Sequence, residues 1–384
     1  MIIRNADVYT EDGRFLPRDI YIEGERFAAL GEARNDTIVI DGSGCYAIPG
    51  LTDIHFHGCM GYDFCDGTWE AIAAMAEYEA SVGVTGIVPA TMTLGEDVLS
   101  GICRAAAEYY GATDKKRGAG FYGIHMEGPF ISSARKGAQN EAYIRNPDLE
   151  MYDRLQKISG HLIRLVDIAP EMDGAMEFIE SLQKRSEGTV ISLAHTAADY
   201  DMAMKAFRRG ASHVTHLYNA MNGYTHREPG LVGAAADYES AEVELICDGI
   251  HVHPAAVRTS FKMFGDDRII LVSDSMRATG MGNGEYELGG QMVKVTGNRA
   301  ILEDGTIAGS VTNLMDCMRR AVLEMGIPLA SAVKCAAVNP AKSVGIYGEC
   351  GSITPGKLAN LVLLKKDSLK TSHVILEGKP ILFV

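Results

Sequence analysis

The sequence predicts an α/β fold in which a (β/α)8 barrel follows a smaller β-rich segment. Two observations support this prediction. Before Pro49 the chain contains only short strand-like pieces separated by turn residues, and no helical period appears until Thr68. After Pro49, strand-like segments alternate with helix-like ones, and eight such strands joined by crossovers are typical of a (β/α)8 barrel. A doubly wound open sheet remains the alternative, because strand count alone does not exclude it.

Each expected element rests on a local pattern. The early strands are short pieces bounded by turns, and we expect them at Met1–Ile3, Asp19–Glu23 and Thr37–Asp41. The helices carry apolar residues at helical spacing, and we expect them at Trp69–Ser81, Asp97–Tyr110, Gly174–Ser186, Tyr200–Arg209 and Pro254–Phe264. The eight barrel strands are expected at Leu51–His57, Gly86–Thr91, Gly120–Glu127, Leu162–Ala169, Val190–His195, His213–Leu217, Val243–Asp248 and Ile269–Asp274.

Composition limits the partners and the location. A chain of 384 residues that is 47% hydrophobic can bury a large core, and its net charge of -14 argues against a nucleic-acid or anionic-membrane partner. The eight cysteines are scattered without a Cys-x-x-Cys pair, so we expect reduced thiols. The N-terminus lacks the features of a signal peptide and no apolar run reaches membrane-spanning length, so we expect a cytoplasmic protein.

The residues that carry chemistry lie at the ends of the expected strands. In an extended strand, His55 and His57 would project from the same face, which suits a metal ligand pair. Taken alone, the pair has an alternative reading as hydrogen-bonded histidines. Metal-type or acid/base residues also end four other strands, at Glu127, His195, His216 and Asp274. Active sites of these barrels form at the C-terminal strand ends, so the coincidence at five strands favours a metal site.

These segments also resemble a known family. His55-x-His57, His125-Met126-Glu127-Gly128-Pro129, Leu193-Ala194-His195-Thr196, Thr215-His216-Leu217-Tyr218-Asn219-Ala220-Met221 and Ser273-Asp274 together resemble the amidohydrolase superfamily and, within it, the N-acetylglucosamine-6-phosphate deacetylases. The resemblance covers essentially the whole chain. It implies a catalytic barrel at 49–345 and a small β-sandwich domain built from 1–48 and 346–384, with residues 351–362 looking like its returning strands.

The resemblance also implies how metal is bound. The expected fourth strand, 162–169, has no lysine that could bridge two ions, which weakens an assignment to the hydantoinases or dihydroorotases. The resemblance implies that Glu127 supplies the bridging carboxylate instead. Glu127, His195 and His216 would hold one divalent ion, with His55, His57, the shared Glu127 and Asp274 near a second. Having both histidines on the first strand favours two ions over one. Zinc is the first expectation, and Fe, Mn and Co also accept this mixed nitrogen and oxygen set.

Substrate contacts follow from the same resemblance. It implies a phosphorylated amino sugar held by Ala138, Gln139, Asn219, Ala220, Arg227, His251, Ile307, Ala308 and Gly309. The Arg227 guanidinium offers a planar fork for phosphate oxygens, although taken singly it is as easily read as a surface charge. Gln139 departs from the family, because some relatives carry histidine there. Glutamine still donates a hydrogen bond but cannot carry charge.

The activity that the resemblance implies is hydrolysis of the acetamide of N-acetylglucosamine 6-phosphate, with Asp274 as general base and then acid. Asp274 also has a structural reading, as a salt-bridge partner or helix cap. One alternative substrate is N-acetylgalactosamine 6-phosphate, and another is a cyclic amide or aminated base. A metal-free scaffold that lost activity is an alternative of another class, although such a chain would normally have shed ligands. The resemblance also suggests a homodimer in which a loop near Arg227 or His251 completes the neighbour's site.

Overall fold

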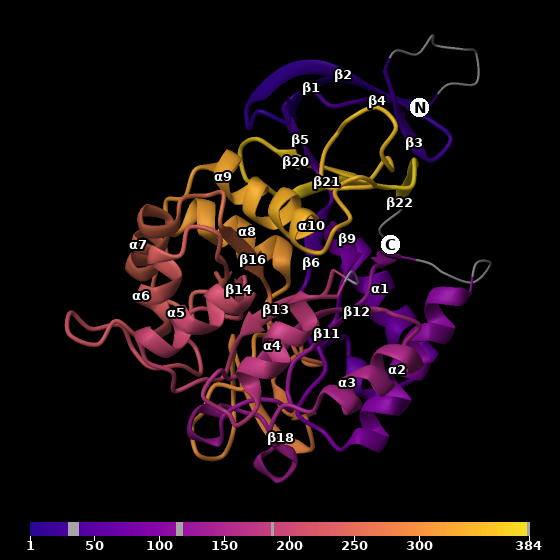
Figure 1. The fold of residues 1–384 in the computed structure, drawn as a ribbon. Coiled ribbons are helices and arrows are strands. Elements are labelled where there is room, and N and C mark those ends of the chain that lie inside the picture. The colour runs from indigo at the N-terminus through magenta and orange to yellow at the C-terminus, as the bar shows by residue number, and fades with distance from the viewer. Residues whose placement is uncertain (30–37, 113–117, 186–187, 382–384) are drawn as a thin grey trace.

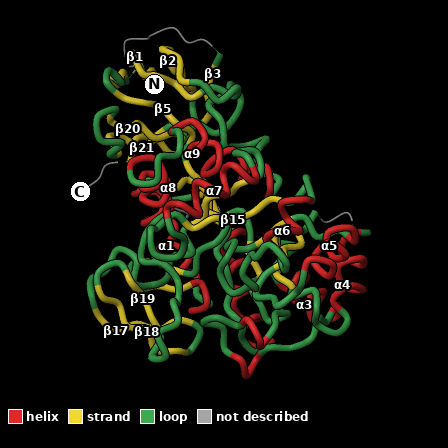
Figure 2. The backbone as a smooth tube through the Cα atoms, turned by 90° about the vertical axis from the view of Figure 1, so that its left-hand side faces the viewer, coloured by secondary structure: helices red, strands yellow, loops and turns green. Residues whose placement is uncertain are grey.

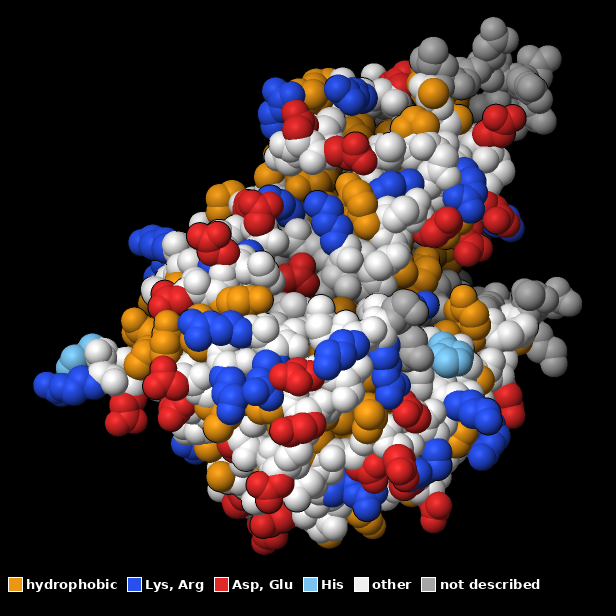
Figure 3. All heavy atoms as spheres, viewed as in Figure 1, with side chains coloured by type: hydrophobic (Ala, Val, Ile, Leu, Met, Phe, Trp, Pro, Cys, Tyr) orange, Lys and Arg blue, Asp and Glu red, His pale blue; other side chains and the backbone are white. Residues whose placement is uncertain are grey.

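Alternating strands and helices form the larger part of the molecule, and strands from both ends of the chain lie together beside it (Figure 1). The computed structural model describes residues 1–29, 38–112, 118–185 and 188–381. Among the described helices, none combines the length and apolar character needed to cross a membrane. On the face shown in Figure 3, basic and acidic side chains are interspersed rather than gathered by sign.

The central strands are parallel and form two sheets, β10-β9-β6 and β11-β12-β13-β14-β15-β16. Backbone contacts join these sheets at both edges. A parallel bridge pairs Ala90 with His125, and Asp274 N–H donates to His55 O at 2.9 Å. The arrangement is TIM-barrel-like, as predicted. Its strands are β6 (Leu51–Asp53), β9 (Val84–Ile87), β10 (Gly120–Phe121), β11 (Ile124–Met126), β12 (Ile163–Ile168), β13 (Val190–Leu193), β14 (His213–Val214), β15 (Glu242–Ile246) and β16 (Ile269–Val272).

The predicted strands were too long at their C-terminal ends. The observed strands stop one to four residues before the chemical residues that were expected to end them. Left-handed backbone explains three of these early ends, because φ is 43° at His195, 33° at His216 and 50° at Asp274. The third predicted strand is also divided into β10 and β11, where Gly123 takes a φ of 154° that disrupts regular pairing.

All five predicted helices are present, and α5 (Tyr200–Arg209) and α7 (Pro254–Phe264) have the predicted bounds. Side-chain caps start several of them, as where Asp199 accepts from Met202 N at 2.8 Å. The prediction omitted α3, α6, α8, α9 and α10, and Ser186, the last residue of the helix expected at Gly174–Ser186, lies outside the described residues. The remaining helices are α1 (Trp69–Val82), α2 (Glu96–Gly111), α3 (Leu149–Ile158), α4 (Ala175–Gln183), α6 (Gly230–Asp237), α8 (Leu314–Leu323), α9 (Leu329–Val333) and α10 (Asn339–Ser343).

Strands from both chain ends share one sheet, in the order β22-β21-β20-β5-β1-β2-β3 with β4 paired to β1. The pairing of strands from both chain ends was predicted and is observed. The predicted packing of these strands as a β-sandwich stays a prediction. Residues 352–360 are mostly loop around the turn at Pro355-Gly356, so the returning strands begin later than the predicted position at 351. Thr37, the first residue of the strand expected at Thr37–Asp41, lies outside the described residues. The strands are β1 (Ile2–Tyr9), β2 (Phe15–Glu23), β3 (Arg26–Ala28), β4 (Val39–Asp41), β5 (Cys45–Pro49), β20 (Leu361–Lys365), β21 (Thr371–Leu376) and β22 (Lys379–Ile381).

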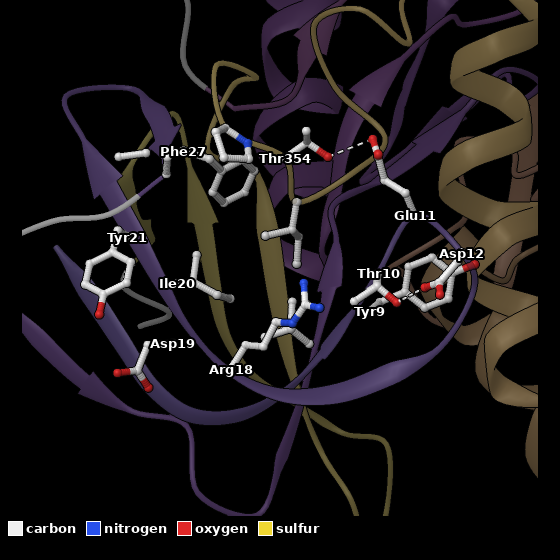
Figure 4. Close-up of a pocket in the computed structure, with 15 residues that line it drawn as sticks. Tyr9, Thr10, Glu11, Asp12, Arg18, Asp19, Ile20, Tyr21, Phe27 and Thr354 are labelled. Carbon is white, nitrogen blue, oxygen red and sulfur yellow. Dashed lines mark hydrogen bonds between the residues drawn. The ribbon is translucent and has the colours of Figure 1, made fainter.

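Two further features lie away from the central strands. A three-stranded antiparallel sheet of β17 (Gly284–Leu288), β18 (Gln291–Thr296) and β19 (Arg299–Ile301) follows β16, and lies at the opposite end of the molecule from the terminal sheet (Figures 1 and 2). A hollow of about 520 Å³ lies against β1 and β2, where Thr354 donates to Glu11 at 2.8 Å (Figure 4). None of the predicted site residues lines that hollow.

Candidate metal centre

Five strand ends bring buried chemical residues to one place. His55 and His57 follow β6, Glu127 follows β11, and His195 and His216 follow β13 and β14. Each of these residues is at most 4% exposed, and Asp274 after β16 is 8% exposed. The left-handed backbone at three of the six positions is uncommon for residues other than glycine, and such conformations concentrate at functional sites.

The first group gathers around one oxygen of Glu127. Its Oε2 atom lies 3.1 Å from His57 Nε2 and 3.5 Å from His55 Nε2. Asp274 closes the group, with Oδ1 at 3.3 Å from His57 Nε2 and 3.8 Å from His55 Nε2. Two imidazole nitrogens and two carboxylates therefore face one small space.

The second group uses the other oxygen of Glu127. Its Oε1 atom lies 2.8 Å from His195 Nε2 and 3.4 Å from His216 Nε2, and the two imidazole nitrogens are 3.0 Å apart. Glu127 therefore stands between two sets of nitrogen ligands, one on each oxygen. Both sets have the spacing of groups able to hold a metal ion.

Hydrogen bonding behind two of the four rings, those of His195 and His55, indicates that their Nε2 atoms carry lone pairs when the rings are neutral. His195 Nδ1 is 3.0 Å from the Arg135 carbonyl oxygen, which only accepts, so a neutral ring donates there and leaves Nε2 unprotonated. His55 Nδ1 likewise donates to Glu244 Oε2 at 2.7 Å. In these two neutral rings a lone pair on Nε2 faces a carboxylate oxygen of Glu127, and His55 Nε2 and Glu127 Oε2 have no hydrogen-bond partner. A divalent cation in each group would satisfy them, and the donors suit Zn, Fe, Mn or Co.

A third cluster, His55 with His125 and Glu244, has similar spacing but different bonding. His125 Nδ1 donates to the Ile54 carbonyl oxygen at 2.9 Å, and its Nε2 lies 3.0 Å from Asp167 Oδ1. Both ring nitrogens of His125 are thus engaged in hydrogen bonds. This cluster supports the site from behind and does not offer a third set of free ligands.

The carboxylates and imidazoles shift one another's ionisation. Burial opposes the ionised form of Glu127, but His55, His195 and His216 hold the pKa of its carboxyl well below the usual range. Burial likewise opposes a charged His57, yet Asp274 and Glu127 raise its pKa to about 10. Glu127 is therefore held as a carboxylate, the form that binds metal. The field that favours a proton on His57 would also favour a cation between these groups.

A cleft of about 390 Å³ opens above the two groups. His55 lies beneath it and is fully buried, whereas the other predicted ligands reach its wall. All the predicted substrate residues except Arg227 line it as well. The predicted residues that line the cleft are His57, Glu127, Ala138, Gln139, His195, His216, Asn219, Ala220, His251, Asp274, Ile307, Ala308 and Gly309.

Several lining residues are fixed by their neighbours. Thr93 N–H donates to Gln139 Oε1 at 2.7 Å, so the donor left to this side chain is its amide NH2, which makes a 3.7 Å contact with Met92 Sδ. His251 Nδ1 lies 2.7 Å from Asp248 Oδ2, which leaves its Nε2 3.8 Å from Asp274 Oδ2. Gly309 has a φ of 112°, and an added Cβ would approach the Asp274 carbonyl oxygen to 3.2 Å, so a glycine suits this close passage.

Arg227 does not reach the cleft of its own chain. It is exposed on the loop before α6, which projects at the left of Figure 1, and it lines a separate hollow with Asp199, Tyr200 and Asp237. The structure therefore does not bring Arg227 to the cleft of its own chain, and its predicted contact with substrate stays a prediction.

The sequence pattern that defines the amidohydrolase family matches residues 46–381 of this chain. The chain belongs to the amidohydrolase family. It is 36% identical to the N-acetylglucosamine-6-phosphate deacetylase of Bacillus subtilis, over 95% of this chain and 90% of that protein. It is 33% identical to the N-acetylgalactosamine-6-phosphate deacetylase of Escherichia coli O157:H7, over 86% of each. A mutant N-acetyl-D-glucosamine-6-phosphate deacetylase of Mycobacterium smegmatis, solved with N-acetyl-D-glucosamine 6-phosphate, superposes with a TM-score of 0.90 at 33% identity, covering 100% of this chain and 99% of that one.

The predicted family is thereby confirmed, and the chain is a hydrolase. Sequence reasoning missed several residues of this amidohydrolase site. Met92 and Leu288 line the cleft, and Glu244, Asp167 and Asp248 support its histidines from behind. Glu244 left a signal, because it is a charged residue between the buried apolar residues Val243 and Leu245 of β15, where a charge is unusual.

Proposed function

We propose that this chain hydrolyses the acetamide of N-acetylglucosamine 6-phosphate to glucosamine 6-phosphate and acetate. The observation that carries the proposal is one cleft in which two histidine groups share Glu127 and open directly onto the predicted sugar contacts. The likeness to deacetylases of phosphorylated amino sugars over nearly the whole chain supports it.

We further infer two divalent ions per chain, with zinc first and Fe, Mn or Co as chemical alternatives. His55, His57 and Glu127 would hold one ion, with Asp274 beside it, and Glu127, His195 and His216 would hold the other. The support for two is that each oxygen of Glu127 faces its own set of imidazole nitrogens. A single-ion site would leave one of these sets unsatisfied.

Asp274 is the residue that moves the proton. A divalent cation bound here supplies Lewis acidity, polarising the amide carbonyl and lowering the pKa of water from 15.7 towards about 7. Burial opposes ionisation of Asp274, but His57, His55 and His251 hold its pKa below the ordinary value, so it is a carboxylate at neutral pH. Its Oδ2 accepts the proton of the attacking water and then returns it to the amine nitrogen as the C–N bond breaks.

The remaining wall of the cleft orients the sugar. The Gln139 amide NH2 and the His251 Nε2 atom offer polar contacts, with Asn219 and the backbone at Ala220 and 307–309 around them. Because Gln139 is neutral, its contact contributes no charge to binding. We assign it to a sugar hydroxyl or the acyl oxygen rather than to the phosphate.

We propose a homodimer in which Arg227 binds the phosphate of the substrate held by the partner. The support is its position, exposed on a projecting loop and outside its own cleft. An Arg supplied by a neighbour would provide the bidentate phosphate contact that the cleft otherwise lacks. His251 in the cleft wall would add a second donor.

Two broader assignments complete the proposal. We divide the chain into a composite terminal domain, 1–48 and 346–384, and a catalytic barrel, 49–345, supported by the sheet that joins both chain ends. We place the protein in the cytoplasm, supported by its eight free cysteines, which a reducing compartment preserves.

The test is acetate release from four substrates: N-acetylglucosamine 6-phosphate, its unphosphorylated form, and the same two forms of N-acetylgalactosamine. Metal content is determined on the same preparation. We expect turnover of phosphorylated sugars only, with the gluco epimer preferred; a galacto preference would move the assignment to the activity of the E. coli relative. No acetate from fully metallated protein would refute the deacetylase assignment.

A further inference from the structure

Glu244 is a fully buried carboxylate inside the barrel, on β15, and three donors surround it. His55 Nδ1 lies 2.7 Å from its Oε2 atom, and the backbone N–H of His216 donates to the same atom at 3.0 Å. His213 Nε2 lies 3.1 Å from Oε1. One carboxylate therefore touches a residue of each ligand group.

We infer that Glu244 is a positioning residue that creates the His55 side of the metal centre. A carboxylate on Nδ1 fixes the tautomer in which the proton is at Nδ1 and the lone pair is at Nε2. His55 Nε2 is the atom that faces Glu127 and Asp274. Without Glu244, His55 would have no acceptor behind it, and either tautomer or a rotated ring would become accessible. The inference rests on the proposed metal site and extends it.

The surroundings of Glu244 indicate that it is not there for packing. Its neighbours on the strand, Val243, Leu245 and Ile246, are buried and apolar, so an apolar residue would suit the strand itself. A buried carboxylate costs free energy unless donors compensate it. Here the compensating donors belong to His55, His213 and His216, so the carboxylate and the histidines are matched to one another.

The two ions should depend on Glu244 unequally. It contacts the imidazole of His55 directly, but only the backbone of His216, whose ring faces Glu127 and His195. His195 is oriented separately, by the Arg135 carbonyl oxygen. Loss of Glu244 should therefore weaken the ion held by His55 and His57, and largely spare the ion held by Glu127, His195 and His216.

Two substitutions of Glu244 distinguish its role as a hydrogen-bond acceptor for His55 from the volume that its side chain fills. In Glu244→Gln, the amide oxygen can still accept from His55 Nδ1 and His216 N, but without the negative charge that strengthens the bond to His55 and raises the basicity of its Nε2 atom. The new NH2 faces His213, which can take its other tautomer and donate from Nδ1 towards Glu242, 3.7 Å away. Glu244→Leu fills the space and removes the acceptor. The matched control is Glu79→Gln, which alters a fully buried carboxyl on α1 that has no hydrogen bond to either ligand group.

The experiment titrates chelator-stripped protein with Zn²⁺ against a chromophoric chelator, with folding checked by circular dichroism. We expect two ions for wild type and Glu79→Gln, two for Glu244→Gln with one Kd raised 10- to 100-fold, and one for Glu244→Leu. Two ions at wild-type Kd in folded Glu244→Leu would overturn the inference. If that variant does not fold, an unchanged Kd in Glu244→Gln would overturn it. Acetate release is not used, so failure of the proposed activity would leave this result standing.

Discussion

Replacing Asp274 with asparagine tests the chemical step most directly. The substitution keeps the size of the side chain and one oxygen that can face His57 Nε2, now 3.3 Å from Asp274 Oδ1. It removes the capacity to accept a proton, because an amide is not a base at neutral pH. The other members of both ligand groups, held by Glu127, stay in place. Metal content should therefore remain close to that of the wild type while turnover falls.

The size of the loss follows from the role assigned to Asp274. General acid–base groups contribute roughly 10²- to 10⁴-fold to rate, which corresponds to about 3 to 5 kcal/mol of transition-state stabilisation. Asp274 would act twice, on water and on the amine, so we expect the upper part of that range. Substrate binding relies on other lining residues, such as Gln139 and Asn219, so KM should change much less than kcat.

The assay is steady-state acetate release at saturating N-acetylglucosamine 6-phosphate, with metal measured in the same sample. Asp248→Asn is the matched control, because it removes a buried carboxylate 2.7 Å from His251 Nδ1 without altering the proposed acid–base group. We expect that control to affect KM more than kcat. A metal-replete Asp274→Asn enzyme with kcat within a few-fold of wild type would remove Asp274 from the proton transfers.

Three other predictions address the ligands, the dimer and the fold. Glu127→Ala should lose most bound metal, since both groups share this carboxylate, and full metal retention by elemental analysis would contradict the ligand assignment. Arg227→Ala should raise KM for the phosphorylated sugar, and mixing it with Asp274→Asn should restore activity if Arg227 acts on the partner's site; no recovery in exchanged dimers would argue against that arrangement. Ser331 and Lys334 hold the pKa of Asp266 below its ordinary value against the effect of burial. Asp266→Asn should therefore lower the free energy of unfolding near pH 7, as measured by denaturant titration. The difference from wild type should shrink as the pH falls through the folded-state pKa of Asp266, because the wild-type carboxylate then also becomes neutral.

The order of elements and the position of the site followed from local patterns. Apolar periodicity located helices such as α5 and α7 to the residue, and the strand-end rule brought five separated segments to one cleft. Local patterns did not predict the strand lengths, because the strands end early where the backbone is left-handed at His195, His216 and Asp274. The histidines and the aspartate take that conformation only within the folded barrel, so no residue type signalled it.

Two features were not predicted from the sequence: the contact of Glu244 with His55, and the position of Arg227 outside the cleft of its own chain. Glu244 lies 189 residues from His55, and only the closed barrel places its carboxylate 2.7 Å from the ring. Arg227 was linked to the sugar contacts by its place in the chain, yet the loop before α6 carries it outward to a separate hollow. Both features depend on which strands and loops become neighbours in space. The periodicity of residues along the chain does not predict those neighbours.

The polar interior of the barrel explains how ligands on separate strands can be held in register. Asp53 Oδ2 accepts from Ser273 Oγ at 2.5 Å, which ties β6 to β16. Asp167 bonds both His125, at 3.0 Å, and Thr215, at 2.7 Å, and so links β12 to β11 and to the turn after β14. Glu244 then joins β15 to the segment after β6. A purely apolar core would pack these strands but would tolerate small slips, whereas directional bonds across strands fix the strand ends relative to one another. A metal centre needs that precision, because its ligands come from five strand ends and must converge within a fraction of an ångström. The cost of burying these carboxylates is therefore offset at the cleft, in the geometry of the ligands that they hold.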